Sequence, residues 1–184
     1  AEPVVSNSKS FTDAISYNNR GSAYHNQGEL DKAIAAFTKA IELDPQLAVA
    51  YNNRGGAYYQ QGELDKAIAD YNMAIELDPA YAVAYYSRGL AYYQRGELDK
   101  AIADFNMAIE LDPQLAVAYS NRGLIYFNQG ELDKAIADYS KAIELDPAYA
   151  SAYYYRGIVF EKLGGVVQAE ADYAKAKELG YEPE

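Results

Sequence analysis

Apolar and small residues recur at helical spacing in the stretch 48–81, which shows the pattern of the whole chain clearly. Within 48–61, the positions i, i+4 and i+7 of one helical stripe are occupied by Tyr51, Gly55 and Tyr58. Within 63–77, a second helical face consists of Leu64, Ala67, Ile68, Tyr71, Ala74 and Ile75. Gly62 stands between the two stretches, and glycine favours a helix end. The pattern therefore predicts two helices joined by a tight turn, which is a helical hairpin.

The hairpin pattern returns every 34 residues along the chain. The turn glycine recurs as Gly28, Gly62, Gly96, Gly130 and Gly164. An Asp-Pro pair recurs at positions 44–45, 78–79, 112–113 and 146–147. This pair should end each second helix, and its proline can start the next helix because its missing donor would be unpaired there anyway. A fixed period of this length predicts stacked repeats, none of which can bury its apolar face alone.

The columns of the repeat also carry a family resemblance. In residues 48–81 these columns hold Tyr51, Gly55, Tyr58, Ala67, Tyr71, Ala74 and Pro79. This spacing resembles the tetratricopeptide repeat (TPR). The same columns hold in 14–47, 82–115 and 116–149, and all but the last of them hold in 150–183. The resemblance therefore covers nearly the whole chain.

The resemblance implies an all-α fold, a right-handed TPR superhelix (an α-solenoid) of five helix-turn-helix hairpins. It implies a TPR domain over residues 14–183, after an N-terminal tail of residues 1–13. It also implies a non-enzymatic protein–protein interaction scaffold that binds an extended peptide or a partner segment in its concave groove. Two other interpretations stay open. One is a self-assembling or consensus-like structural scaffold, and the other is the regulatory TPR part of a larger protein.

The two ends of the array differ from its middle. In the last repeat, Glu170 and Lys177 replace the isoleucines of two apolar columns, and Tyr181 stands in the proline column. Two columns that turn charged together predict a capping surface on residues 150–183, and Gly180 is expected to stop the last helix. Ser10 is expected to cap the first helix. The chain begins Ala-Glu-Pro, which leaves open a removed signal peptide or a trimmed start, and a cytoplasmic or periplasmic location.

A helical wheel separates two sides of each first helix. One side should pack on the second helix, and small residues such as Ala50 and Ala57 should admit the neighbouring repeat. The opposite side and one of its shoulders should form the groove. The predicted peptide-binding residues are Asn18, Asn19, Asn52, Asn53, Tyr59, Tyr86, Leu90, Tyr93, Asn121, Leu124, Phe127 and Tyr154. They change from polar toward apolar along the chain, so we expect a ligand to bind in one direction.

The asparagine column of this groove has two interpretations. Asn19, Asn53 and Asn121 match the asparagine ladder that grips extended peptide backbone in the TPR superhelix of the nucleocytoplasmic sugar-transferring glycosyltransferase. Such a match implies peptide binding, whereas the alternative is solvated surface. Ser87 and Tyr155 interrupt the ladder here. A carboxylate clamp, in which chaperone-tail TPRs place Lys and Arg beside Asn, is not expected because only the Asn column is present.

The aromatic and arginine columns also allow two interpretations each. Tyr59, Tyr93 and Phe127 either face a ligand or fill the space between first helices. The arginines either pair with acids between helices, such as Asp70 or Asp104, or bind an anion. The arginine column consists of Arg20, Arg54, Arg88, Arg122 and Arg156.

Composition narrows the function classes further. The chain has no Cys and one histidine, His25, which disfavours thiol chemistry, metal sites and catalysis. Glu63, Asp65 and their copies recur at the start of second helices, where helix capping and the helix dipole explain them better than catalysis. We expect no cofactor and no metal. The net charge of −11 disfavours nucleic acid, and no apolar run is long enough for membrane insertion. The expected partner is a protein or peptide, with self-association as an alternative.

Overall fold

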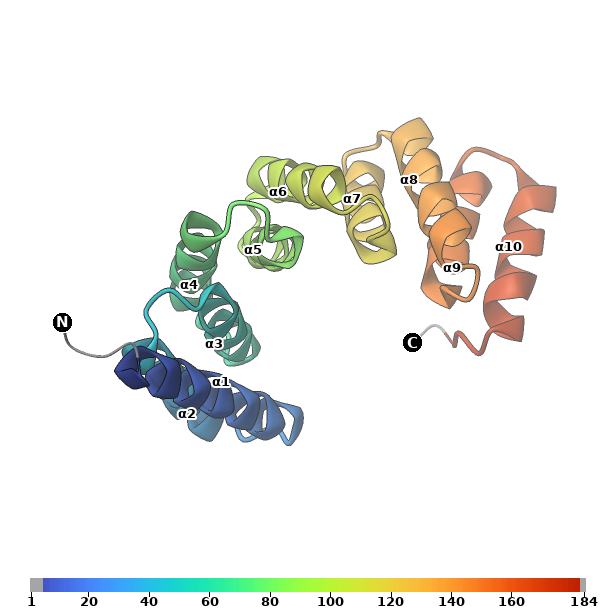
Figure 1. Cartoon of the computed structure of the whole chain (residues 1–184). Helices are drawn as coiled ribbons and strands as arrows, with labels where there is room; N and C mark the ends of the chain where they lie inside the picture. The colour runs from blue at the N-terminus through green and yellow to red at the C-terminus, as the bar shows by residue number, and fades with distance from the viewer. Residues whose placement is uncertain (1–4, 183–184) are drawn as a thin grey trace. The chain divides into compact units, whose positions relative to one another are not determined.

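The computed structural model describes the backbone of residues 5–182 and the side chains of residues 10–182. Within these residues the chain forms ten α-helices and no strand (Figure 1). The helices are α1 (Val5–Asn26), α2 (Leu30–Leu43), α3 (Ala48–Gln60), α4 (Leu64–Leu77), α5 (Ala82–Gln94), α6 (Leu98–Leu111), α7 (Ala116–Asn128), α8 (Leu132–Leu145), α9 (Ala150–Lys162) and α10 (Val166–Glu178). The all-α prediction is confirmed. Odd-numbered helices are the first helices of the repeats, and even-numbered helices are the second.

Two compact units divide the chain, Ala1–Ala101 and Ile102–Glu184, and the boundary falls inside α6. In the first unit, α3 contacts α1, α2, α4 and α5, while α1 also contacts α2. In the second unit, α9 contacts α7, α8 and α10, while α7 also contacts α8. The paired helices α1 and α2 run side by side in Figure 1, as do α9 and α10. Each unit is therefore a stack of hairpins in sequence order.

Glycines with a left-handed backbone make the turns inside the hairpins. Positive φ angles of 76° to 80° occur at Gly28, Gly62, Gly96, Gly130 and Gly164. After the first of these, the amide of Glu29 donates to the carbonyl oxygen of Tyr24 at 2.9 Å and closes the turn. Glycine adopts this backbone without the steric cost that other residues meet, which explains its recurrence.

Small residues let the hairpins of the first unit approach closely. Ala57 of α3 is fully buried and packs against Ala33 and Phe37 of α2. Inside the α3–α4 hairpin, a Cβ atom built on Gly55 would lie 2.8 Å from the Tyr71 ring. The close approach of α3 to α4 therefore requires glycine at this column. The prediction that small residues admit the neighbouring repeat is confirmed.

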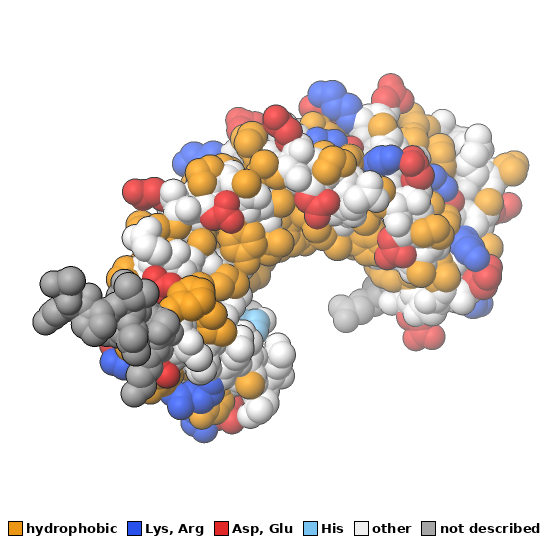
Figure 2. All heavy atoms as spheres, in the orientation of Figure 1, with side chains coloured by type: hydrophobic (Ala, Val, Ile, Leu, Met, Phe, Trp, Pro, Cys, Tyr) orange, Lys and Arg blue, Asp and Glu red, His pale blue; other side chains and the backbone are white. Residues whose placement is uncertain are grey.

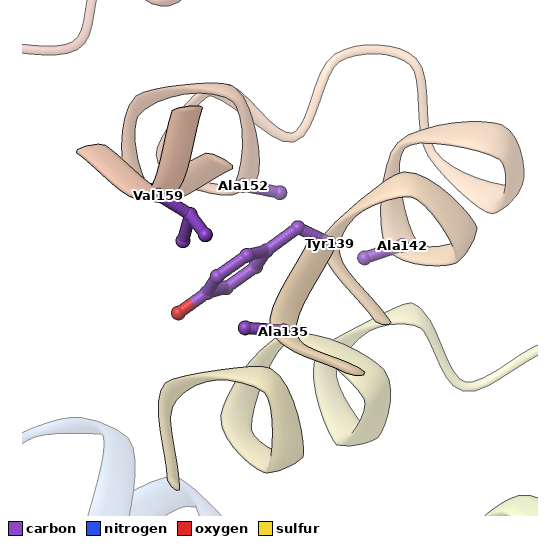
Figure 3. Close-up of a cluster of buried hydrophobic side chains, with 5 residues drawn as sticks. All are labelled: Ala135, Tyr139, Ala142, Ala152 and Val159. Carbon is purple, nitrogen blue, oxygen red and sulfur yellow. The ribbon is translucent and has the colours of Figure 1, made fainter. Parts of the chain in front are cut away.

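The core of the second unit forms where α8 packs against α9. Tyr139 of α8 is fully buried among Ala135, Ala142, Ala152 and Val159 (Figure 3). The last two residues belong to α9, so the aromatic ring of one repeat fills the space left by small residues of the next. Complete burial of a large apolar side chain contributes roughly 1.5–3 kcal/mol to folding. Packing of this kind between repeats joins the hairpins of the unit.

The start of α1 corrects one expectation. The helix begins at Val5, so Ser10 lies inside it and is not its N-cap. The hydroxyl of Ser10 instead donates to the carbonyl oxygen of Leu43 at 2.8 Å. This contact ties α1 to the end of α2. Residues 1–4 of the predicted tail lie outside the described residues.

The start of α4 corrects a second expectation. Glu63 occupies the N-cap position, but its side chain makes no capping hydrogen bond. It forms an ion pair with Lys66, and the neighbouring Asp65 pairs with Arg95 at 2.7 Å. These carboxylates therefore serve surface ion pairs, and side-chain capping does not explain Glu63.

Candidate peptide-binding surface

The first helices of the first unit share one surface. Helices α1, α3 and α5 contact in sequence, and one column across them holds Ile15, Val49 and Val83. Ile15 and Val83 are 37% and 44% exposed, and Asn19 beside Ile15 on α1 is exposed as well. We call this surface the first-helix face. It combines apolar side chains with an amide that can bond both groups of a peptide unit.

The four asparagines predicted on this face divide into buried and open ones. Asn18 and Asn52 are each 8% exposed, so both side chains lie in packed interfaces. Asn53 is half-buried, and its Nδ2 donates to Asn18 Oδ1 at 3.0 Å, which joins α3 to α1. Asn19 is the open member of the set. The structure therefore brings these residues together, but three of the four are engaged between helices, and Asn19 is the exposed one.

The other candidates in the first unit are half-buried: Tyr59, Tyr86, Leu90 and Tyr93. Tyr59 packs against the buried cluster that contains Tyr71 and Ala91, and burial raises the pKa of its phenol. Burial raises the pKa of Tyr71 even more strongly. This placement favours the space-filling interpretation for Tyr59.

Three members of the arginine column pair with buried aspartates. Arg54 Nε and Nη2 donate to the two carboxylate oxygens of Asp70 at 2.7 and 2.8 Å. The same bidentate geometry joins Arg122 to Asp138 and Arg156 to Asp172. Hydrogen bonding to Asp70 raises the pKa of Arg54. Since each guanidinium is held by a carboxylate of its own repeat, the ion-pair interpretation is confirmed for these three arginines.

A small pocket opens between α1 and α3, with a volume of about 210 Å³. Its lining comes from α1 (Ser22, His25, Asn26), α2 (Phe37) and α3 (Asn52, Asn53, Gly56). Two buried polar atoms of this lining, His25 Nε2 and Asn52 Oδ1, have no hydrogen-bond partner. Figure 2 shows the histidine in pale blue at the surface of the first unit, with hydrophobic side chains in orange and other side chains or backbone in white around it. A buried polar atom without a partner costs about 1–3 kcal/mol, so these two covered atoms lower the stability of the fold.

Gly56 differs from its neighbour Gly55 in what a side chain would meet. A Cβ atom on Gly56 would find nothing within 4 Å, and the residue lies inside α3 without a positive φ. Glycine inside a helix costs about 0.5–1 kcal/mol relative to alanine. Neither packing nor backbone geometry thus explains Gly56, and its missing side chain keeps the pocket open.

The candidates in the second unit are engaged within their own unit. Asn121 is half-buried, and its Nδ2 donates to the carbonyl oxygen of Val117 at 2.8 Å, one turn back along α7. Leu124 is half-buried. Phe127 packs against the core cluster around Tyr139. The fourth candidate, Tyr154, lines a separate cavity.

An aromatic cavity of about 640 Å³ lies at the last repeat. The Tyr154 ring lies 5.6 Å from the Tyr173 ring and 4.8 Å from the Tyr181 ring, measured between centroids. The Tyr173 hydroxyl donates to Glu161 Oε2 at 2.6 Å, and burial followed by this bond raises the pKa of Tyr173 to about 12. Lys177 also lines the cavity. We call this feature the aromatic cavity.

Gly180 places Tyr181 in the aromatic cavity. Its φ is 83°, and the amide of Tyr181 donates to the carbonyl oxygen of Ala176 at 2.9 Å. This geometry ends α10, as the sequence predicted, and folds the chain back toward Tyr154. Glu170 and Lys177 are both exposed on α10, and their capping role stays a prediction.

The sequence reasoning missed most of the residues that line these two spaces. The single histidine, His25, is disfavoured as a site by composition, and the sequence pattern alone gives Gly56 no separate role. Tyr181 was noted only as a departure from the proline column. The signal that could have found Gly56 is the leucine at equivalent positions of the next two repeats, Leu90 and Leu124.

A family model described as TPR repeat matches residues 21–62, 55–96, 89–130 and 123–164. The overlapping matches cover well over half of the chain. The chain belongs to the tetratricopeptide repeat family. None of the curated proteins compared with it matches.

Solved TPR structures are similar to this chain over most of its length. MamA is 33% identical, with 86% of this chain and 93% of that chain covered and a TM-score of 0.77. YrrB, described as a TPR protein with an unusual peptide-binding site, is 26% identical, with 91% and 87% covered and a TM-score of 0.70. The first TPR of Spaghetti (RPAP3), bound to the HSP90 peptide SRMEEVD, is 30% identical, with 65% and 95% covered and a TM-score of 0.63.

Two other kinds of site were sought in the described part of the chain. No helix within residues 5–182 is long and apolar enough to cross a membrane. Among the same described residues, no group of three His, Cys, Asp or Glu side chains is placed to hold a metal ion.

Proposed function

We propose that this TPR protein is a non-enzymatic interaction module, whose first-helix face binds an extended peptide segment of a protein partner. The TPR fold is typically an interaction scaffold, and the proposal assigns binding to α1, α3 and α5 of the first unit. YrrB and the RPAP3 repeat support this assignment, since both are described with a peptide or a peptide-binding site. The proposed binding surface lies entirely within the first unit.

The observation that carries the proposal is the exposed apolar column beside polar amides. Ile15 and Val83 are more than a third exposed, although α3 lies packed between their helices. Exposed apolar side chains grouped on one face, rather than scattered singly, are typical of interaction surfaces. Asn19 adds an open amide that can bond the backbone of an extended peptide.

A displayed library of random peptides tests the proposal. Peptides selected on the wild-type chain are synthesised, and their affinities are measured by fluorescence anisotropy for Val83→Asp and for Ala69→Asp. Ala69 is exposed on α4, away from the first-helix face, so its variant adds the same charge elsewhere. We expect Val83→Asp to weaken binding at least about tenfold, because an ionised side chain replaces an apolar contact.

The same two variants also show which results would contradict the proposal. Equal weakening by Val83→Asp and Ala69→Asp would place the binding surface off the first-helix face. A library that yields no peptide above background would contradict peptide binding as the function. Circular dichroism on both variants confirms that the helices are retained.

A further inference from the structure

We propose that the aromatic cavity of the last repeat binds an arginine side chain of a protein partner, between its tyrosine rings and its carboxylates. The inference goes beyond the proposed function, because it concerns the second unit rather than the first-helix face. Three features support it: a wall of tyrosine rings, two carboxylates without an ion pair, and the way in which the chain holds its own arginines.

The first feature is a group of tyrosine rings that the fold does not enclose completely. Tyr154, Tyr173 and Tyr181 are half-buried, and all three line the cavity of about 640 Å³. The centroid of the Tyr154 ring lies 5.6 and 4.8 Å from the other two, so the rings form one aromatic wall. The other members of the Tyr173 column are at most 2% exposed: Phe37, Tyr71, Phe105 and Tyr139. Because the face of an aromatic ring attracts a cation within about 6 Å of its centroid, this wall favours a cationic ligand.

The second feature is a pair of carboxylates beside these rings. Glu161 and Glu182 line the cavity and are exposed, and neither forms an ion pair within the described residues. Glu161 Oε2 accepts from the Tyr173 hydroxyl at 2.6 Å, which leaves its Oε1 for a ligand. Lys177 is the one cation of the described lining, and it is exposed as well. The lining therefore carries more negative than positive charge.

The third feature is the way in which the chain holds its own arginines. Arg54 donates to both carboxylate oxygens of Asp70, and its guanidinium carbon lies 5.7 Å from the centroid of the Tyr51 ring. Arg122 and Arg156 combine an aspartate and a tyrosine ring in the same way. The aromatic cavity has the rings and the carboxylates of this arrangement, and its described lining includes no arginine. An arginine from a partner would complete it.

A guanidinium matches this lining better than other cationic groups do. It is planar, so it can stack on a tyrosine ring while its N–H groups point in the same plane toward a carboxylate. A lysine ammonium is more strongly hydrated and has no flat face to stack. A quaternary ammonium has no N–H to donate to the carboxylates. The combination of rings and carboxylates therefore selects arginine.

Blocked amino acids test the assignment directly. The probe is N-acetyl-arginine methylamide, which carries the side chain without charged termini. N-acetyl-citrulline methylamide, its neutral isostere, tests the charge, and N-acetyl-lysine methylamide tests the planar group. Binding is followed by NMR through the ¹³Cζ signals of labelled Tyr154, Tyr173 and Tyr181, assigned by a phenylalanine substitution at each position. We expect a saturable shift with the arginine probe, and affinities at least about tenfold lower for the other two.

Two charge changes in the lining should shift the affinity for the arginine probe in opposite directions. Glu182→Gln removes a carboxylate and should weaken binding about threefold, whereas Lys177→Gln removes a like charge and should strengthen it about threefold. Both residues are exposed, so both variants should fold. Glu170→Gln is the matched control, because Glu170 is exposed on α10 but does not line the cavity. Val83→Asp, in the first unit, should also leave the affinity for this probe unchanged.

Three results would overturn the inference. Equal affinities for the arginine and citrulline probes would show that charge plays no part in binding. The absence of a saturable shift with the arginine probe would show that the cavity does not bind this side chain. Free L-arginine that binds at least about tenfold more tightly than the blocked probe would assign the cavity to a free amino acid rather than to a protein partner. Because the probe reports on the second unit alone, failure of peptide binding at the first-helix face is a separate result.

Discussion

Two columns of the repeat line both the pocket at α1–α3 and the aromatic cavity at α9–α10, but they hold different residues at the two places. His25 and Phe37 in the first repeat correspond to Glu161 and Tyr173 in the last, each pair 136 residues apart in the sequence. In the last repeat, the Tyr173 hydroxyl donates to Glu161. In the first repeat, Phe37 has no hydroxyl, and His25 Nε2 stays without a partner. The two shared columns therefore form a tyrosine–glutamate hydrogen bond in the last repeat, and a histidine with a phenylalanine in the first.

The two sites also differ in what covers them. The following first helix, α3, packs against α1 and α2, and Gly56 is one of the residues that line the pocket there. At the last repeat, the chain's own Tyr181 folds onto Tyr154. The same two columns therefore contribute to an open pocket in the first repeat and to a self-covered end in the last.

Two glycine substitutions, one at each site, should change the free energy of unfolding in opposite directions, and this is the largest expected effect. Gly157→Ala in the second unit places a Cβ atom 2.7 Å from the Tyr173 ring, and overpacking of this kind typically costs about 1–3 kcal/mol. Gly56→Ala should instead stabilise the chain by about 0.5–1 kcal/mol, through helix propensity alone. Equilibrium urea unfolding measures both. Effects of the same sign would show that Gly56 has a packing role and would remove the contrast.

Removal of the Tyr181 ring should give the next largest effect. Tyr181→Ala deletes the ring 4.8 Å from Tyr154, and aromatic pairs contribute about 0.5–1.5 kcal/mol beyond burial. The urea midpoint should fall, while Tyr181→Phe, which keeps the ring, should stay near wild type. If Tyr181→Ala matches the wild type, Tyr181 does not cover the last repeat.

The smallest effect concerns the ionisation of Tyr173. Burial and the hydrogen bond to Glu161 raise its pKa from the ordinary value of 10.0 to about 12. The folded state therefore keeps this proton longer than the unfolded state. The resulting stabilisation is complete below pH 10 and is lost as the pH rises through about 12. An NMR titration of ¹³Cζ-labelled tyrosine, assigned by Tyr173→Phe, should show this late transition. Glu161→Ala should move the pKa back toward 10.0, and an unchanged titration would contradict the role of Glu161.

The fold could be predicted from the sequence because the residues that determine each hairpin recur in every repeat. Every hairpin carries the same turn glycine, and the helical stripes identify the buried positions. Pairing between helices was one of two interpretations of the arginine column, and Arg54 pairs with Asp70 as that interpretation expects. Two predictions of helix capping were wrong. Ser10 lies inside α1, and Glu63 pairs with Lys66 rather than capping α4.

The candidate site was less predictable because a helical wheel treats one helix at a time. Asn18 and Asn52 fall on the expected side of their helices, but contacts between repeats bury them. Gly55 and Gly56 are adjacent and chemically identical, and only the position of Tyr71 shows which one packing requires. The significance of His25 likewise depends on the atoms around it.

The paired arginines have a consequence for how a partner arrives. Arg54, Arg122 and Arg156 are each neutralised by a buried aspartate, so they contribute little to the field around the protein. The net charge of −11 therefore originates mainly from exposed carboxylates, which outnumber the lysines on the surface. Such a field draws cationic segments from about 10 Å away at moderate ionic strength and repels anionic ones. Basic residues flanking a bound peptide would thus speed its capture, and added salt would slow it.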